Sequence, residues 1–336
     1  MSGPPVVLAV DGGGSKTDLA LVRADGALLS LVRGPKSSPH HVGLDGSLEV
    51  LEQLLRTARG EAGIDGAGQV AEVAELLMAG VDFPSEEEAL RDAVERRGWA
   101  AATSVVNDTF AILRAGTETG WGVAVVCGTG MNCVGVGPDG RHARFPALGP
   151  TTGDWGGGYD LGLAALFAAA RSEDGRGAKT TLEQAVPAHF GLETPAELAE
   201  AIHRGQIPVR RLEELPRLVL AEAERDAEAA AIVDRLAVEV VAFARVALER
   251  LELTDAPVEV LLGGGLLQTG DGRLLGVIET GLREVGPRIT ARRTSSPPIV
   301  GAALLGLDQL GSDHDAYDRA QRELGAAVAE IGGSRG

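Results

Sequence analysis

Residues 6–26, VVLAVDGGGSKTDLALVRADG, decide how this chain is interpreted, because their glycine-rich turn is a candidate phosphate-binding segment. The P-loop pattern G-x-x-x-x-G-K-[ST] requires glycine where Val10 and Ser15 stand, so that motif is absent. The dinucleotide pattern G-x-G-x-x-G fails as well, since Thr17 fills its third glycine position. Neither common strand-to-helix phosphate motif therefore explains the turn.

The residues after the turn predict a second strand rather than a helix. Leu19 and Leu21 belong to a short β-rich run that ends at Asp25-Gly26, a dipeptide typical of tight hairpin turns. The glycine turn should therefore join two antiparallel strands. Phosphate would then be held by turn amides and hydroxyls, and Asp11, at the end of the first strand, would face a metal-bound phosphate.

A second stretch repeats this unit. Residues 121–140, WGVAVVCGTGMNCVGVGPDG, again contain an apolar strand, a glycine-rich turn, a second strand and an Asp-Gly turn. The spacing from the lead residue of the turn to that aspartate is 14 for Asp11 and Asp25, and 12 for Cys127 and Asp139. We infer an internal duplication, which predicts two similar domains facing each other across a cleft.

The remaining segments indicate a mixed α/β sheet. A third strand near 27–33 and a helix near 45–60 follow the first hairpin, and strands and helices then alternate. One of these helices is expected to begin at Ser85, with Glu88 completing a capping box. Three meander strands followed by alternating helices and strands predict the same α/β class for both copies.

The length of 336 residues and the duplication predict two domains. No low-complexity linker is present, so short crossings near residues 117 and 312 should join the domains. The N-terminal domain would comprise residues 1–117 and 313–332, and the C-terminal domain residues 118–312.

Composition restricts the class of partner. The chain has 48 acidic and 31 basic residues and a net charge of -17, which argues against nucleic acid or an anionic membrane as a partner. No apolar run reaches the roughly 18 residues of a membrane span, and the N-terminus lacks the features of a signal peptide. A cytoplasmic protein is expected.

Cys127 and Cys133 have a spacing that suits neither zinc nor redox motifs, which favours buried free thiols.

Four motifs occur in an order that resembles the acetate and sugar kinase/Hsp70/actin superfamily: DGGGSKT, NDT after a strand, CGTGMN and LLGGG. Within it, the chain resembles the N-acetylglucosamine kinase branch of the benzoyl-CoA reductase activator-type ATPase family, from residue 6 to about 311. The resemblance implies two duplicated ribonuclease H-like domains, each a mixed five-stranded sheet with flanking helices, around an ATP/sugar cleft. It also implies a homodimer that uses ATP and Mg²⁺ and phosphorylates a small-molecule sugar, most simply at the 6-hydroxyl of N-acetylglucosamine.

The resemblance assigns a role to each matching residue. Asp11 would orient Mg²⁺ through water, and Asp108 would be the general base. The phosphates would be held by Gly13, Gly14, Ser15, Lys16 and Thr17 of the first turn and by Gly128, Thr129 and Gly130 of the second. Adenosine would lie against Gly263, Gly264 and Gly265. The sugar would contact Ser38, Asn107, Asp108, Asn132, Leu148 and Asp154.

These roles also make chemical sense without the family. Phosphoryl transfer needs Mg²⁺, backbone donors on the phosphates and one carboxylate that accepts the proton of the attacking hydroxyl. Asp108, at the end of an apolar strand, is suited to that task. Short carboxylates and amides, such as Asp154 and Asn132, accept and donate hydrogen bonds together and therefore suit sugar hydroxyls.

Several positions depart from the pattern of N-acetylglucosamine kinases. Ser38 would replace a sugar-contacting amide, and Met131 removes a hydroxyl on the phosphate side. Leu148 stands where tryptophan usually lines the acetamide pocket, and Trp155 replaces an acid. Glucosamine or another hexose is therefore an alternative acceptor. A further alternative is an activator-type ATPase coupled to a partner enzyme, which needs cysteines at a dimer face.

Some of these residues have structural interpretations as well. Asp108 could cap the following helix, Asp154 could cap a helix that starts near Gly157, and Lys16 could be a solvated hairpin lysine. Trp155 could stack on a sugar ring or pack internally.

His40 and His41 raise the question of a metal. Adjacent residues of an extended chain face opposite sides, and no third ligand is spaced along the sequence to join these two. We therefore expect a loop at the mouth of the cleft rather than a metal centre.

Overall fold

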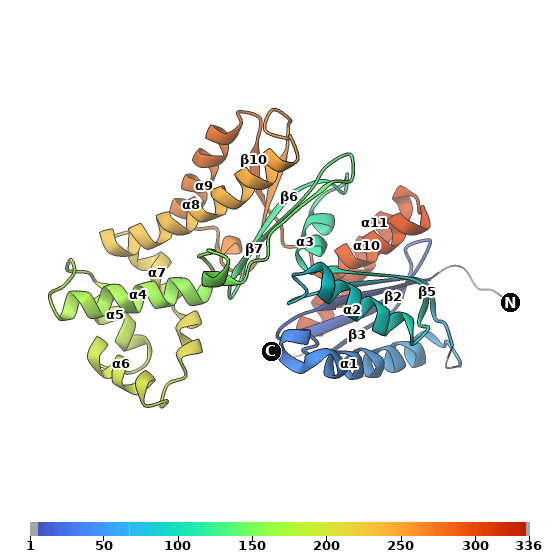
Figure 1. Ribbon diagram of the computed structural model, residues 1–336, viewed down its shortest axis with the longest axis horizontal. Coiled ribbons are helices and arrows are strands. Elements are labelled where there is room, and N and C mark those ends of the chain that lie inside the picture. Colours follow the sequence, from blue (N-terminus) through green and yellow to red (C-terminus); the bar gives the residue numbers. More distant parts are fainter. Residues whose placement is uncertain (1–5, 67, 334–336) are drawn as a thin grey trace. The chain divides into compact units, whose positions relative to one another are not determined.

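The computed structural model describes residues 6–66 and 68–333 (Figure 1). The chain divides into two compact units. Unit 1 is formed by Met1–Trp121 and Ser295–Gly336, and unit 2 by Gly122–Thr294.

Unit 1 contains a mixed five-stranded sheet in the order β3-β2-β1-β4-β5. The strands are β1 (Val6–Gly12), β2 (Lys16–Arg23), β3 (Leu28–Pro35), β4 (Ala71–Met78) and β5 (Ala100–Asn107). β1 and β2 are antiparallel, with Asp11 opposite Asp18 and Gly12 opposite Thr17, so the glycine turn joins two strands as predicted. β4 lies parallel to both β1 and β5, which brings the carboxyl ends of these three strands to one edge of the sheet.

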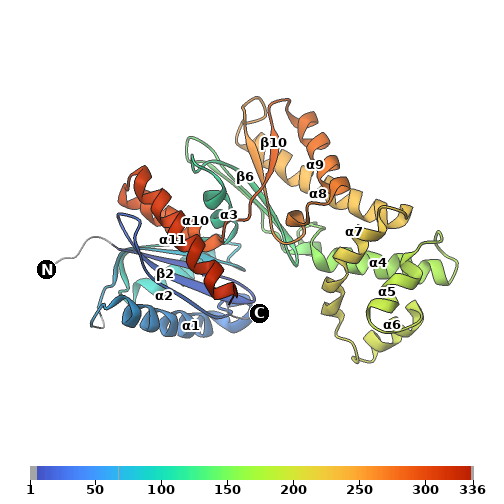
Figure 2. The ribbon, with the colours of Figure 1, turned by 180° about the vertical axis from the view of Figure 1, so that it is seen from behind.

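Helices cover both faces of this sheet. They are α1 (Pro39–Ala62), α2 (Pro84–Glu95), α3 (Thr109–Gly116), α10 (Pro298–Leu310) and α11 (His314–Gly333). α1 and α2 share one apolar core with the side chains of Leu8, Val10 and Leu19, and Leu48, Leu51, Leu55 and Ala58 of α1 are buried in it as their spacing predicts. α10 packs on β1, β4 and α3, and Figure 2 shows it with α11 on the face opposite α1.

α10 also locates the second crossing between the units. The predicted crossing near residue 312 would have placed this helix in the C-terminal domain. Ile299, Val300, Leu304 and Leu307 of α10 are instead buried in unit 1, whose second segment begins at Ser295. The chain therefore returns to unit 1 before α10 begins, because the apolar face of this helix is covered by β1, β4 and α3.

The start of α2 differs from the prediction. The helix begins at Pro84 after Phe83, and Glu86, not Glu88, is the third helical residue. Its Oε2 accepts hydrogen bonds from the backbone N–H groups of Asp82 (2.8 Å) and Phe83 (3.0 Å). The predicted capping box from Ser85 to Glu88 is wrong, since proline favours the first helical position and shifts the cap toward the N-terminus.

Unit 2 repeats the sheet of unit 1. Its strands are β6 (Gly122–Cys127), β7 (Met131–Val136), β8 (His142–Arg144), β9 (Glu259–Gly263) and β10 (Thr290–Arg293), in the order β10-β9-β6-β7-β8. β6 and β7 form the antiparallel hairpin, and β9 lies parallel to β6 and β10. The order and directions match those of unit 1, which confirms the predicted duplication and the α/β class.

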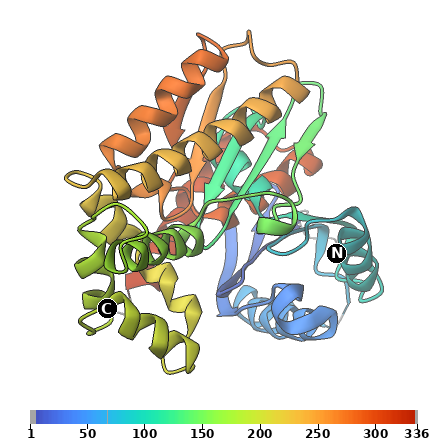
Figure 3. The ribbon, with the colours of Figure 1, turned by 60° about the vertical axis from the view of Figure 1, so that its left-hand side comes forward.

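Unit 2 is enlarged by a helical segment between β8 and β9. The helices of this segment are α4 (Gly158–Glu173), α5 (Leu182–His189), α6 (Pro195–His203), α7 (Pro216–Glu222) and α8 (Ala227–Arg250), with the short 3-10 turns η1 (Gly149–Thr151) and η2 (Val209–Glu214). The 3-10 turn η3 (Leu267–Thr269) and the helix α9 (Gly272–Val285) lie between β9 and β10. α8 and α9 lie side by side, as Figure 3 shows.

Cys127 and Cys133 are buried free thiols, as predicted. None of the helices in residues 6–66 and 68–333 is long and apolar enough to cross a membrane.

A buried glutamate between β4 and α10 makes the stability of unit 1 depend on pH. Glu75 is 2% exposed, and its Oε1 accepts a hydrogen bond from Nε2 of Gln309. Burial raises the pKa of Glu75 from 4.5 to about 7. Because the folded state binds the proton more tightly, the stabilisation is complete below pH 4.5 and is lost as pH rises through 7.

We expect Glu75→Gln to be more stable than the wild-type protein at pH 8. The free energy of unfolding should rise by up to about 3 kcal/mol, at roughly 1.4 kcal/mol per unit of pKa shift. The difference should shrink at pH 5, where both side chains are neutral. Urea unfolding at the two pH values measures this, and an equal difference at both would contradict the buried titration.

Candidate active site

The first glycine turn lies between β1 and β2 and leaves its tip accessible. The backbone N–H of Gly13 donates to the carbonyl of Lys16 (2.9 Å), and Gly14 and Ser15 are exposed. The carbonyl of Gly13 accepts hydrogen bonds from the backbone of Ser37 (3.3 Å) and Ser38 (3.4 Å). The segment before α1 therefore supports the turn from inside unit 1.

Two predicted phosphate ligands of this turn have partners within unit 1. Lys16 Nζ lies 3.0 Å from Oδ2 of Asp18. The same carboxylate accepts hydrogen bonds from Nε and Nη2 of Arg33. Thr17 is fully buried, and its Oγ1 donates to Oγ of Ser37 (2.8 Å). The exposed residues of the turn are therefore Gly14, Ser15 and Lys16.

Asp11 and Asp108 form an acidic pair at the carboxyl edge of the unit 1 sheet. Asp11 is the sixth residue of β1, and Asp108 follows β5 directly. The pKa of Asp11 is raised to about 7, first by burial and then by the carboxylates of Asp108 and Asp18. The pKa of Asp108 is raised to about 6, by burial and by the carboxylate of Asp82. Carboxylates from β2, the connection after β4 and the end of β5 thus raise pKa values at this edge.

Asn107, rather than Asp108, makes the capping interaction at the start of α3. Oδ1 of Asn107 accepts hydrogen bonds from the backbone N–H (3.0 Å) and the hydroxyl (2.7 Å) of Thr109. The Asp108 side chain makes no capping hydrogen bond. Nδ2 of Asn107 donates to Oδ1 of Asp82 (2.8 Å). The interpretation of Asp108 as a helix cap is therefore not supported, and the Asn107 amide is oriented from both ends.

Ser38, predicted to contact sugar, lies just before α1. It is 2% exposed, and a Cβ added to Gly80 in the connection after β4 would lie 2.9 Å from its Oγ. Ser38 therefore belongs to the same edge of the unit 1 sheet as Asn107.

Unit 2 contains a cavity of about 470 Å³ beside its glycine turn. The cavity is lined by Gly128, Thr129, Gly158, Glu213, Glu214, Pro216, Arg217, Gly265, Leu266 and Thr269. Its volume is in the range of small-molecule sites. The structure therefore brings the second glycine turn and the 263–265 segment together on one cavity.

The second turn is fixed by the start of α4. The backbone N–H of Gly158 donates to the carbonyl of Gly128 (2.8 Å), and that of Tyr159 donates to the carbonyl of Thr129 (3.2 Å). Within the turn, Gly128 N–H donates to the carbonyl of Gly130 (2.9 Å). The turn thus has a defined shape before any ligand binds.

The 263–265 segment follows β9 and requires glycine at its centre. Gly264 has a φ of +85°, and a Cβ there would lie 2.3 Å from the carbonyl oxygen of Cys127. Gly263 ends β9 opposite Val126, and Gly265 has no heavy atom within 4 Å of an added Cβ. Gly264 therefore packs against the end of β6, while Gly265 faces the cavity.

The predicted sugar contacts of unit 2 lie in two places. Asn132 is in β7, where its Oδ1 accepts a hydrogen bond from the backbone of Cys133 (2.7 Å). Leu148 and Asp154 belong to one loop, because Thr152 Oγ1 accepts from the backbone of Leu148 (2.8 Å) and donates to the carboxylate of Asp154. Thr152 thus ties these two predicted residues together.

The loop that contains Asp154 and Trp155 ends at the start of α4. Gly157 precedes α4 without a side-chain cap, and Asp160 accepts the hydrogen bond from the backbone of Gly156 (2.9 Å). Asp154 is therefore not the cap of α4. Trp155 stacks under the guanidinium of Arg235, whose carbon lies 3.9 Å from the ring centroid.

Sequence reasoning missed several residues of the cavity. Glu213, Glu214, Pro216 and Arg217 line the cavity from the junction of η2 and α7. The proline that starts α7 signals a helix start, but no motif in this stretch indicates a ligand.

The fold and the two glycine turns define a duplicated two-unit α/β protein of the sugar kinase and actin type. The model of the BadF/BadG/BcrA/BcrD ATPase family matches residues 8–306, and the chain belongs to this family. The resemblance inferred from the four motifs is thereby confirmed.

Similar proteins are kinases of amino sugars by name. The N-acetylmuramic acid/N-acetylglucosamine kinase of Clostridium acetobutylicum is 30% identical over 265 residues, which cover 78% of this chain and 85% of that protein. The N-acetyl-D-glucosamine kinase of Dictyostelium discoideum is 31% identical over 186 residues, 53% of this chain and 58% of that protein. A solved structure from Chromobacterium violaceum, described as a candidate N-acetylglucosamine kinase, has a TM-score of 0.69 and 27% identity, covering 90% of this chain and 99% of that one.

Proposed function

We propose that the protein is an ATP-dependent kinase that transfers the γ-phosphate to a hydroxyl, the 6-hydroxyl, of N-acetylglucosamine or a closely related amino sugar. The observation that carries this proposal is the acidic pair Asp11 and Asp108, both with raised pKa values, at the carboxyl edge of the unit 1 sheet, in a chain of an ATPase family. The relatives named above support the amino sugar as acceptor.

Asp108 is proposed as the general base. A pKa of about 6 leaves the carboxylate ionised at neutral pH but basic enough to accept a proton from a hydroxyl that attacks phosphate. Because Asn107 supplies the capping interaction of α3, the Asp108 carboxylate is not needed to start that helix. This division of roles supports a chemical rather than a structural function for Asp108.

Asp11 is proposed as the residue that orients Mg²⁺ through water. Its environment fits a cation, since burial and the carboxylates of Asp108 and Asp18 all disfavour its negative charge, and Lys16 and Arg33 pair directly with Asp18. When bound, Mg²⁺ would neutralise charge on the β- and γ-phosphates of ATP. Asp11 would hold the ion and keep it oriented.

The nucleotide is proposed to bind in two parts. The adenosine would occupy the cavity of unit 2. It would contact the backbone of Gly263, Gly264 and Gly265, because glycine has no side chain to keep it away. Turn amides of Gly128, Thr129 and Gly130 in unit 2, and of Gly13, Gly14 and Ser15 in unit 1, would donate to the phosphates. Lys16 and Thr17 would support the first turn through Asp18 and Ser37.

Sugar contacts are proposed by resemblance within each unit. Asp154, oriented by Thr152, and Asn132 would bond sugar hydroxyls, and Leu148 would face the N-acetyl group. In unit 1, Ser38 and Asn107 would lie beside the base. Glucosamine or another hexose is the alternative acceptor, because Ser38, Leu148 and Trp155 depart from the usual pattern.

The activator-type ATPase alternative gains no support from the cysteines. Such a protein needs thiolates at an accessible dimer face. Cys127 and Cys133 are buried, and burial raises the pKa of Cys127 to about 12 and also raises that of Cys133.

By resemblance, we also propose a cytoplasmic homodimer, and light scattering would test the dimer.

The function is tested by coupled ADP release with glucose, glucosamine, N-acetylglucosamine, N-acetylmannosamine and N-acetylmuramic acid. We expect Mg²⁺-dependent turnover that is fastest with N-acetylglucosamine or N-acetylmuramic acid. Turnover with glucosamine or glucose alone would favour the alternative acceptors. ATP hydrolysis that no sugar changes would contradict the kinase assignment.

A further inference from the structure

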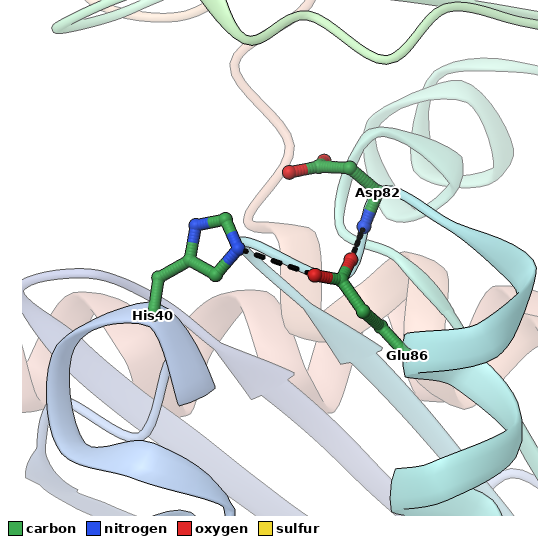
Figure 4. Close-up of side chains that lie close together, drawn as sticks. All are labelled: His40, Asp82 and Glu86. Carbon is green, nitrogen blue, oxygen red and sulfur yellow. Dashed lines mark hydrogen bonds and ion pairs between the residues drawn. The ribbon is translucent and has the colours of Figure 1, made fainter.

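Three side chains with metal-ligating atoms meet in unit 1, beside the proposed base but outside the phosphate-binding turn. They are His40 in the first turn of α1, Asp82 after β4 and Glu86 in the first turn of α2 (Figure 4). One ligand atom of each lies within 4.8 Å of the other two. Nε2 of His40 is 3.4 Å from Oε1 of Glu86. An imidazole and two carboxylates thus converge from three separate segments.

Each carboxylate is held by a partner outside the set of three ligand atoms. Oε2 of Glu86 accepts two backbone hydrogen bonds at the start of α2, which leaves Oε1 directed at His40. Oδ1 of Asp82 accepts a hydrogen bond from the Asn107 amide (2.8 Å). Such second-shell partners orient ligands and are typical of metal sites.

The histidine is positioned by a close backbone approach. A Cβ added to Gly80 would lie 2.9 Å from Cγ and 3.1 Å from Nδ1 of His40, so only glycine lets the ring lie against this connection. His40 Nε2 is thereby directed to the two acids, as Figure 4 shows. All three ligands can therefore meet an ion with little rearrangement of the backbone.

We propose that His40, Asp82 and Glu86 form a binding site for a divalent transition-metal ion, with Zn²⁺ preferred, distinct from the Mg²⁺ proposed at Asp11. One imidazole and two carboxylates suit Zn²⁺ and, more weakly, Mn²⁺, and water would complete the coordination. The ion would replace the contact between His40 and Glu86 and would join the start of α1 to the connection before α2. The binding itself does not depend on the proposed kinase activity.

Binding is tested by titrating metal-stripped protein with ZnCl₂ in competition with a chromophoric chelator. We expect one equivalent of Zn²⁺ and a higher melting temperature in its presence. His40→Ala and Glu86→Gln should each weaken binding at least tenfold. Glutamine can still accept both backbone hydrogen bonds at the start of α2, so that variant should fold.

His189→Ala is the matched control, because His189 Nε2 also lies close to a glutamate, Glu214 (3.1 Å), without belonging to a three-ligand group among the described residues. It should bind Zn²⁺ as the wild-type protein does. Zn²⁺ binding that survives both His40→Ala and Glu86→Gln, or wild-type protein that takes up no Zn²⁺, would overturn the site.

A kinetic consequence follows only if the proposed function holds. Asp82 bonds Asn107, which precedes Asp108, so Zn²⁺ should alter sugar-dependent ADP release at saturating Mg²⁺ in the wild-type protein. The effect should be lost in Glu86→Gln. If the protein shows no turnover but binds Zn²⁺ through His40, the kinase proposal fails and the metal site stands.

Discussion

Replacing Asp108 by asparagine should lower the rate of sugar-dependent ADP release by about 10²–10⁴-fold, the usual loss when a general base is removed. Asparagine has nearly the same shape but cannot accept the proton of the attacking hydroxyl. ATP should bind with unchanged affinity, because Asp108 is not among the residues proposed to hold the adenosine, the phosphates or Mg²⁺. Steady-state ADP release and equilibrium binding of a fluorescent ATP analogue measure the two effects.

The fold should tolerate this change. Asn107 caps α3, and the raised pKa of Asp108 means that its negative charge is disfavoured in the folded state. Asp108→Asn should therefore melt at the same temperature as the wild-type protein or higher. Glu75→Gln removes a buried carboxylate of the unit 1 sheet, one that contacts α10, and should keep its turnover. Retained turnover in Asp108→Asn, or equal losses in both variants, would contradict the assignment of the base.

The hairpins could be predicted because their signals are local. Alternating apolar residues, a glycine turn and an Asp-Gly dipeptide specify strand, turn and strand within about twenty residues, and both copies have the register that this pattern requires. The duplication follows from the same signals. The membership of α10 in unit 1, by contrast, depends on contacts with β1 and α3, which lie far away in the sequence.

Side-chain partners were less predictable than elements. Lys16 and Thr17 begin β2 directly after a turn that looks suited to phosphate, yet their hydrogen bonds go to Asp18 and Ser37, the latter 20 residues from Thr17. The cap at Glu86 could have been found from Pro84, because proline at the first helical position fixes the third.

Two groups of residues, the three around His40 and those that line the unit 2 cavity, are not predicted by any sequence motif. His40 meets Asp82 and Glu86 only because the strand order places α1 and the connection after β4 at one edge of the sheet. Arg217 and its neighbours reach the cavity of unit 2 because the segment before α7 turns back toward the second glycine turn. The spacing of these residues along the chain does not predict either set of contacts, so only the folded structure shows them.

Two neighbouring glycines of the 263–265 segment should respond in opposite ways to alanine. Gly264→Ala forces a side chain into the left-handed region at φ +85° and places its Cβ 2.3 Å from the carbonyl oxygen of Cys127. The strain and the overlap with backbone should lower the free energy of unfolding by about 2–5 kcal/mol. Urea unfolding measures this loss, and wild-type stability would show that the segment can rearrange without cost.

Gly265→Ala should leave stability within about 0.5 kcal/mol of the wild-type value, because no heavy atom lies within 4 Å of the added Cβ. Its methyl group would instead enter the cavity where adenosine is proposed to approach the backbone. We expect ATP affinity to fall about tenfold, or roughly 1.4 kcal/mol, in isothermal titration calorimetry. Wild-type ATP affinity in a stable Gly265→Ala protein would mean that the nucleotide does not lie against this segment, and the adenosine assignment would then be wrong.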